Sequence, residues 1–197
     1  MLTAPAIQNF KDTLFEAPEH GKPPEVFAIL DGAGVRRLPD LLEDEDLEHA
    51  CLFTGETDPI ILIRAPWLVK LTRDSAITEV LLTEGWKQNW GIFTVCPHGA
   101  DFEDVLDHFR EFIQVRLPDA RLVFFRFYDP RVWRQFLPSC DATQAGQLFD
   151  LPGAFACEAE DGVSLIVDTL RDGLPYRRTV DLFSSAPSIP ALEPVRP

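Results

Sequence analysis

The chain has 197 residues, of which 46% are hydrophobic and 25% are charged, so it has the apolar content of a folded globular protein and is not mainly disordered. Its 32 acidic residues outnumber its 18 Lys and Arg, and a net charge of -14 repels nucleic acid phosphates and anionic lipid headgroups. We therefore expect neither a nucleic acid nor a membrane surface as a partner. The length fits one domain, whose core needs no metal or disulfide.

The cysteine pattern and the first residues indicate the compartment. The four cysteines, Cys51, Cys96, Cys140 and Cys157, form no C-x-x-C pair and stand among apolar neighbours, so we interpret them as reduced core thiols. The start of the chain lacks the basic and apolar regions of a secretory leader. No apolar run is long enough to cross a bilayer. We expect a cytoplasmic protein.

The first half of the chain predicts alternating strands and helices. A Pro-rich segment over residues 1–24 leaves room for one short helix, over residues 7–15. Apolar runs bounded by turn residues predict strands, with the second and third paired across a turn. These strands cover residues 26–30, 51–53, 60–63 and 90–95. Apolar spacing and N-cap residues predict helices over residues 38–42, 76–85 and 102–113.

The second half adds a strand pair, two helices and a closing meander. We predict strands over residues 115–117 and 122–128, the second of them central because both of its faces are apolar. Helices are predicted over residues 130–137, with Asp129 as the N-cap and Pro130 first, and over residues 141–149. The last three strands are expected over residues 155–158, 163–170 and 176–183.

This order of elements favours an α/β or α+β fold, with a mixed β-sheet flanked by helices and closed by a β-meander. We expect a single domain over residues 25–183. It follows the Pro-rich segment over residues 1–24 and precedes a flexible tail over residues 184–197, rich in proline and serine.

Motifs for catalysis or cofactor binding are weak. No G-x-S-x-G nucleophile motif and no complete phosphate-binding glycine loop occurs; Gly32 and Gly34 form only part of one. Cys96 and His98, together with one of the other cysteines or with His108, have the side chains for zinc, but their spacing matches no known finger, so a core thiol beside a loop histidine is favoured. We expect no metal, no cofactor and no small-molecule substrate.

The most distinctive cluster lies at residues 126–131. Arg126 interrupts an apolar strand, and a buried guanidinium needs a carboxylate, which Asp129 or Asp31 can supply. One interpretation is a catalytic acid with an anion-binding arginine. The other is an N-cap and an ion pair that hold the corner between strand and helix. We favour the second, because no further acid, base or nucleophile stands at an informative spacing.

Six segments, taken in order, resemble the adaptor or effector-chaperone proteins of bacterial type VI secretion. They are Phe-Ala-Ile-Leu-Asp-Gly-Ala from Phe27, Leu-Phe-Thr-Gly from Leu52, Arg-Ala-Pro-Trp-Leu-Val from Arg64, Trp-Gly-Ile-Phe from Trp90, Leu-Asp-His-Phe-Arg from Leu106, and Phe-Arg-Phe-Tyr-Asp-Pro-Arg-Val from Phe125. The resemblance covers residues 26–160. Leu-Phe-Asp-Leu-Pro-Gly from Leu148 departs from the Phe-Phe-Gly-Pro stretch that is usual in that family.

The resemblance implies a non-enzymatic, cytoplasmic, bacterial adaptor or chaperone. Such a protein binds a secreted toxin effector and helps load it onto the spike protein at the tip of the apparatus. The resemblance also implies a scaffold role for the signature residues: Asp31, Gly32, Arg64, Pro66, Arg126, Asp129, Pro130 and Arg131. Large aromatic side chains are favoured interface anchors, which makes Trp67, Trp86 and Trp133 the candidate partner-binding residues.

Two alternatives from other functional classes remain at the level of the sequence. The first is a small hydrolase that uses Asp31 or Asp129 together with Arg126. The second is an immunity-like toxin inhibitor, whose acidic segment over residues 43–48 would block a basic toxin site by charge complementarity.

Overall fold

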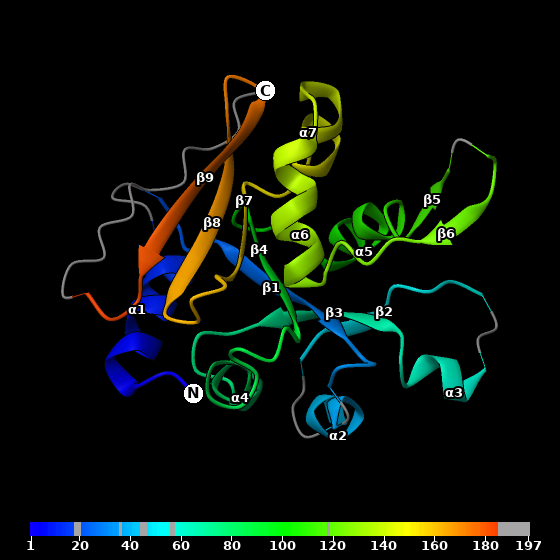
Figure 1. The fold of residues 1–197 in the computed structure, drawn as a ribbon. Coiled ribbons are helices and arrows are strands. Elements are labelled where there is room, and N and C mark those ends of the chain that lie inside the picture. The colour runs from blue at the N-terminus through cyan, green and yellow to red at the C-terminus, as the bar shows by residue number, and fades with distance from the viewer. Residues whose placement is uncertain (18–20, 36, 44–46, 56–57, 118, 185–197) are drawn as a thin grey trace.

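One seven-stranded sheet, with helices on both of its faces, organises the computed structural model of the chain (Figure 1). The structure describes residues 1–17, 21–35, 37–43, 47–55, 58–117 and 119–184. The strand order is β2-β3-β1-β4-β7-β8-β9, and a separate two-stranded sheet pairs β5 with β6. The acidic segment is described only in part, and the tail only at Ser184, so predictions for the rest of both lie outside the described residues.

The bounds of the elements are as follows. The strands are β1 Glu25–Asp31, β2 His49–Cys51, β3 Pro66–Leu71, β4 Gly91–Cys96, β5 Gln114–Arg116, β6 Leu122–Phe124, β7 Ala154–Glu158, β8 Ser164–Arg171 and β9 Leu174–Asp181. The helices are α1 Ala4–Phe15, α2 Leu38–Glu43, α3 Pro59–Leu62, α4 Ala76–Thr83, α5 Phe102–Arg110, α6 Pro130–Phe136 and α7 Ala142–Leu148, with a 3-10 turn over Leu137–Ser139.

The predicted α+β class and the closing meander are confirmed. β7, β8 and β9 follow one another as antiparallel neighbours at one end of the sheet. Every strand pairing among the described residues is antiparallel. The mixed sheet that we expected from the sequence was therefore wrong. β1 pairs with β3 on one side and with β4 on the other, so Ile29 stands between Leu68 and Ile92.

Alternation along β1 divides the interior into two cores, because successive side chains of a strand point to opposite faces. Val26, Ala28 and Leu30 pack into the core beneath α1, α2 and α4. Phe27 and Ile29 pack into the core beneath α5, α6 and α7. The helix α1, which lies within the expected separate segment over residues 1–24, inserts Phe10 into the first core, with its ring 4.9 Å from that of Phe93.

The prediction of a strand over residues 60–63 was wrong. Residues Pro59–Leu62 form helix α3, which begins where the carbonyl of Asp58 accepts hydrogen bonds from the amides of Ile61 and Leu62. Proline favours the first position of a helix, and the side chain of Ile61 is 50% exposed. The strand that pairs with β2 is β3 instead.

The prediction of a central strand over residues 122–128 was also wrong. Only Leu122–Phe124 form a strand, β6, and its single partner is β5. Leu122 and Phe124 are 58% and 60% exposed, so one apolar face of this strand has no core against it.

Within the described residues, no helix combines the length and the apolar content needed to span a bilayer.

Candidate functional site

Four charged side chains meet where β1 ends and α6 begins; we call Asp31, Arg126, Asp129 and Arg131 the charged corner. The guanidinium of Arg126 donates a hydrogen bond to Asp31 and lies 3.8 Å from an oxygen of Asp129. Arg131 binds Asp129 through two nitrogens, at 2.9 and 2.7 Å. The expected pairing of Arg126 with these acids is confirmed. Its side chain is 47% exposed, however, so the expected burial of the guanidinium was wrong.

The electrostatics of the charged corner keep Asp129 ionised. Burial alone would raise the pKa of Asp129, but the hydrogen bonds and the charge of Arg131 outweigh it and hold that pKa below its ordinary value. Asp129 is also the N-cap of α6, because its carboxylate accepts a hydrogen bond from the amide of Arg131 at 2.9 Å. Burial, together with the charge of Asp31, raises the pKa of the neighbouring Tyr128 to about 12. A general acid needs a raised carboxyl pKa, so Asp129 is unsuited to that role.

The charged corner is joined to the start of β3 through Gly32. The amide of Gly32 donates a hydrogen bond to the carbonyl of Ala65, at 3.0 Å, next to the pairing of Asp31 with Pro66. A Cβ atom at this glycine would lie 2.5 Å from the same carbonyl oxygen, so a larger residue does not fit without a shift of the backbone. The charged corner therefore connects three segments that are distant in sequence: the ends of β1 and β6 and the α3–β3 loop.

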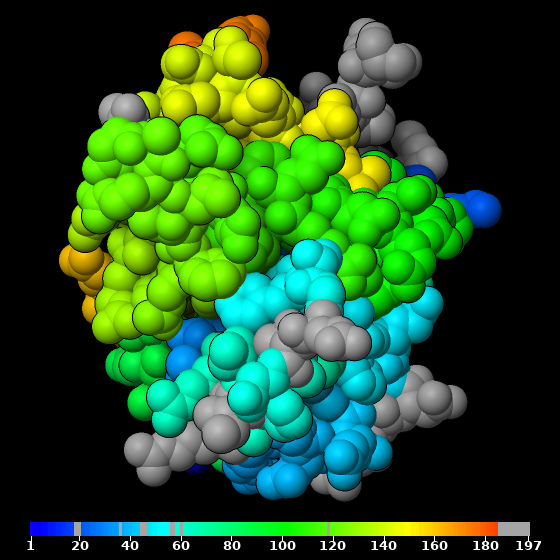
Figure 2. Space-filling model, turned by 90° about the vertical axis from the view of Figure 1, so that its right-hand side faces the viewer, coloured from blue at the N-terminus to red at the C-terminus, as the bar shows by residue number. Residues whose placement is uncertain are grey.

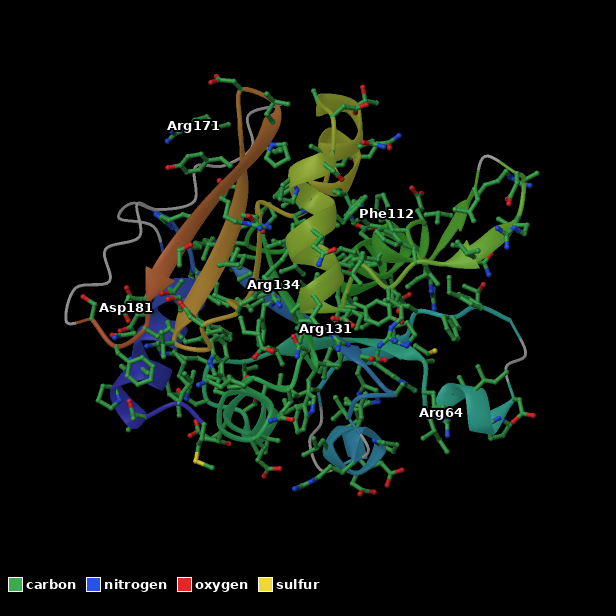
Figure 3. All side chains as sticks on the ribbon, viewed as in Figure 1. Arg64, Phe112, Arg131, Arg134, Arg171 and Asp181 are labelled. Carbon is green, nitrogen blue, oxygen red and sulfur yellow. The ribbon has the colours of Figure 1, made fainter. Side chains whose placement is uncertain are left out.

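The signature residues named from the sequence separate into two groups. Asp31, Gly32, Pro66, Arg126, Asp129, Pro130 and Arg131 belong to the charged corner or its immediate connections. Arg64 does not. Its side chain is exposed, and no described residue pairs with its guanidinium. Figure 3 shows Arg131 at the foot of α6 and Arg64 beside α3.

A groove of about 370 Å³ lies beside the charged corner; we call it the hairpin groove. One wall consists of residues 52–54, Asp58 and Ile61, from the loop after β2 and from helix α3. The other wall consists of Arg110, residues 113–114 and Phe124, from the end of α5 and the β5–β6 hairpin. Figure 2 faces this side of the molecule, with the yellow-green hairpin above the cyan residues of the β2–α3 segment.

One face of the hairpin forms the wall of this groove. Gln114 stands directly opposite Phe124, and Arg116 stands opposite Leu122, so these four side chains share a face. The ring of Phe53 lies 4.8 Å from that of Phe124 and connects the two walls at the floor of the groove. Together with Ile61 and Ile63, which are 50% and 52% exposed, Leu122 and Phe124 give this side of the molecule a concentration of exposed apolar side chains. Exposed apolar clusters of this kind mark interaction sites.

Two of the three tryptophans proposed as partner contacts lie in the cores instead. Trp133 is fully buried, and Trp86 is 3% exposed and donates its indole N–H to the carbonyl of Gly162 at 3.0 Å. Trp67 is half-buried and donates to the carbonyl of Leu62 at 3.2 Å. Large aromatic rings bury the most apolar area, so the fold gains most when these side chains lie in a core.

The sequence reasoning missed Ile61, Leu122 and Phe124 as surface residues. A signal was present, because arginines at 121 and 126 bracket the apolar run from Leu122, close to the turn at residues 118–120. Charges at both ends of so short a run are typical of an exposed hairpin rather than of a central strand.

The structure also places the residues considered for zinc binding and the four cysteines. Among the described residues, no group of three or more His, Cys, Asp or Glu side chains is placed to hold a metal ion. Burial raises the pKa of both Cys96 and Cys157 to about 12, so these thiols stay protonated and unreactive at neutral pH. His98 faces the carbonyl of Pro23, at 3.0 Å. The four cysteines are free; Cys96, Cys140 and Cys157 are buried, as expected, whereas Cys51 is only half-buried.

Comparison with protein families gives a match over most of the chain. The family model described as a domain of unknown function, DUF4123, matches residues 26–147, a range that contains the charged corner and the hairpin groove. Comparison with curated proteins and with solved structures gave no match.

Proposed function

The chain belongs to the DUF4123 family, and from this membership we propose that it is a non-enzymatic adaptor or chaperone for a type VI secretion effector. The family is linked with the effector chaperones of that system. In this role the protein binds a toxin effector in the bacterial cytoplasm and assists its loading onto the spike protein.

The hairpin groove is the observation that carries the proposal. A protein whose task is to hold another protein needs an accessible apolar surface with polar surroundings. Ile61, Leu122 and Phe124 supply the apolar surface, and Gln114 and Arg110 supply the polar edge. The groove also contains a pair of aromatic rings in contact, Phe53 and Phe124, of the kind that serves as an interface anchor.

The charged corner supports a binding role rather than catalysis. Its two buried carboxylates accept hydrogen bonds from arginines and from backbone amides, so their oxygens already serve the fold. The charged corner also fixes the base of the hairpin to the end of β1, and in this way it positions the groove.

Purification of the tagged chain from the bacterium that encodes it tests the proposal. We expect a toxin effector and a spike protein to co-purify with the wild type and to be lost with the double variant Ile61→Ser and Phe124→Ser. The matched control is Leu174→Ser, because Leu174 is 52% exposed at the start of β9 and lies outside the hairpin groove. Absence of a spike protein from the wild-type preparation, or equal recovery with the groove variant, contradicts the proposal.

A further inference from the structure

The β6 strand has an open edge. The amide of Phe125 donates to the carbonyl of Ile113, and that of Leu117 donates to the carbonyl of Arg121. In an antiparallel pair, bonded and non-bonded residue pairs alternate, so Leu122 and Phe124 are non-bonded positions whose main-chain groups point away from β5. No described residue pairs with these groups. An edge of this kind can accept another strand.

This edge lies at the hairpin groove. In Figure 1, β6 is the strand of the hairpin nearer to the segment between β2 and α3, in agreement with the contact between Phe53 and Phe124. A strand added to β6 would place alternate side chains beside Leu122 and Phe124, between the two walls of the groove. Its other side chains would lie on the face of Arg121 and Val123.

The charge around this edge differs from that of the whole protein. The hairpin over residues 114–126 holds three arginines, one acidic residue and no lysine, whereas the chain has a net charge of -14. The side chain of Arg116 donates to the carbonyl of Ala120 and has no carboxylate partner among the described residues. Arg121 pairs with Asp119 at the exposed turn, where an ion pair is weak and open to exchange.

We propose that the hairpin groove binds an extended segment of the partner, with alternating apolar and acidic residues, which adds to the edge of β6 as a further strand. Main-chain hydrogen bonds to Leu122 and Phe124 supply the pairing, the apolar residues contact Leu122 and Phe124, and the acidic residues lie on the opposite face, beside Arg121. This inference rests on the proposed function and specifies the chemistry of the bound segment.

The test uses the full chain and a heptapeptide of alternating Glu and Val, with a Lys–Val heptapeptide as the matched control. We expect the Glu–Val peptide to slow hydrogen exchange at the amides of Leu122 and Phe124, and the Lys–Val peptide to leave it unchanged. Leu122→Pro removes an outward-facing N–H and keeps the pairing with β5, whereas Leu122→Ala removes only the side chain. We expect the proline variant to bind the Glu–Val peptide about tenfold more weakly than the alanine variant, the effect of one lost main-chain hydrogen bond.

Three results would overturn the inference. They are equal affinity of the proline and alanine variants, equal binding of the two peptides, and protection of the β6 edge in the absence of peptide through a concentration-dependent dimer. A Glu–Val peptide N-methylated at alternate amides repeats the test from the ligand side, should the proline variant fail to fold. Purification from the bacterium separates the two proposals when one of these results is found. If the wild-type protein still recovers an effector and a spike protein, only strand addition is contradicted and the adaptor role remains. If it recovers neither, the adaptor role itself is contradicted.

Discussion

The indole N–H of Trp133 donates a hydrogen bond to the carboxylate of Asp168, at 2.9 Å, and neither residue is exposed. Arg177 binds the same carboxylate through two nitrogens, at 2.8 and 3.0 Å, and donates to the carbonyl of Arg134. This network connects α6, which follows the charged corner, to β8 and β9 of the meander. A buried carboxylate is stable only with such partners.

Replacement of Asp168 by alanine should therefore destabilise the protein strongly. The change leaves the N–H of Trp133 without an acceptor and the guanidinium of Arg177 without a carboxylate, and we expect the free energy of unfolding to fall by about 3–5 kcal/mol. Urea denaturation measures it. Asp181→Ala, at an exposed position of β9 (Figure 3), is the control, with an expected loss below about 1 kcal/mol. Equal losses for the two variants would show that the network does not stabilise the fold.

Replacement of Arg126 by alanine should lower the free energy of unfolding by less than its position in an apolar run of sequence indicates. Its side chain is 47% exposed, but its partner Asp31 is buried. The expected loss of unfolding free energy is about 1–2 kcal/mol, between the values for exposed and buried ion pairs. Arg64→Ala, at an exposed arginine without an ion pair to a described residue, should change the stability by less than about 0.5 kcal/mol. A loss of about 3 kcal/mol or more, the size expected when a buried ion pair is broken, would indicate a buried guanidinium.

The lowered pKa of Asp129 predicts part of the acid sensitivity. Because the pKa is lower in the folded than in the unfolded state, ionised Asp129 stabilises the fold above the unfolded value of about 4, and this contribution is lost as the pH falls through the folded value. The Asp129→Asn variant keeps an N-cap residue but lacks this titration. In thermal melts at a series of pH values, the stability of the Asp129→Asn variant should fall less steeply below about pH 4 than that of the wild type.

The raised pKa of Glu158 should have the opposite effect on stability, which should fall as the pH rises. Burial raises its pKa, although its carboxylate accepts hydrogen bonds from the amides of Lys87 and Asn89. Its contribution is therefore fully present below the unfolded pKa and is lost as the pH rises through the folded value. In Glu158→Gln, the loss of stability with rising pH above about 4.5 should disappear. The same slope in the wild type and the variant would assign the pH dependence to another group.

Thiol labelling should distinguish Cys51 from the other cysteines. Cys51 is half-buried at the end of β2, whereas Cys96, Cys140 and Cys157 are buried. Burial raises the pKa of all four thiols, so the difference between them is access to the reagent. We expect iodoacetamide, at about pH 8, to modify Cys51 first in the native protein and all four cysteines after denaturation. Peptide mapping by mass spectrometry identifies the modified sites. Early labelling of Cys157 would contradict its place in the core.

Local signals in the sequence predicted much of the fold. Asp101, Asp129 and Asp141 begin their helices as N-caps, because a short acidic side chain satisfies a free amide wherever a helix starts. The apolar runs of β1 and β4 predicted strands because they are apolar at successive positions and end at turn residues. The partner acids of Arg126 followed from charge alone.

What only the tertiary structure decided is which apolar residues are buried. The run from Leu122 and the run that contains Ile61 read like core strands, yet both are exposed at the hairpin groove, while Trp86 and Trp133 are buried. Burial depends on which distant segments pack against a residue, and Arg126 contacts Asp31 only because the chain folds back across 95 positions. The sequence by itself determined the N-caps and the strands β1 and β4, because these depend on neighbouring residues. The packing of distant segments determined which charges meet and which surface a partner can reach.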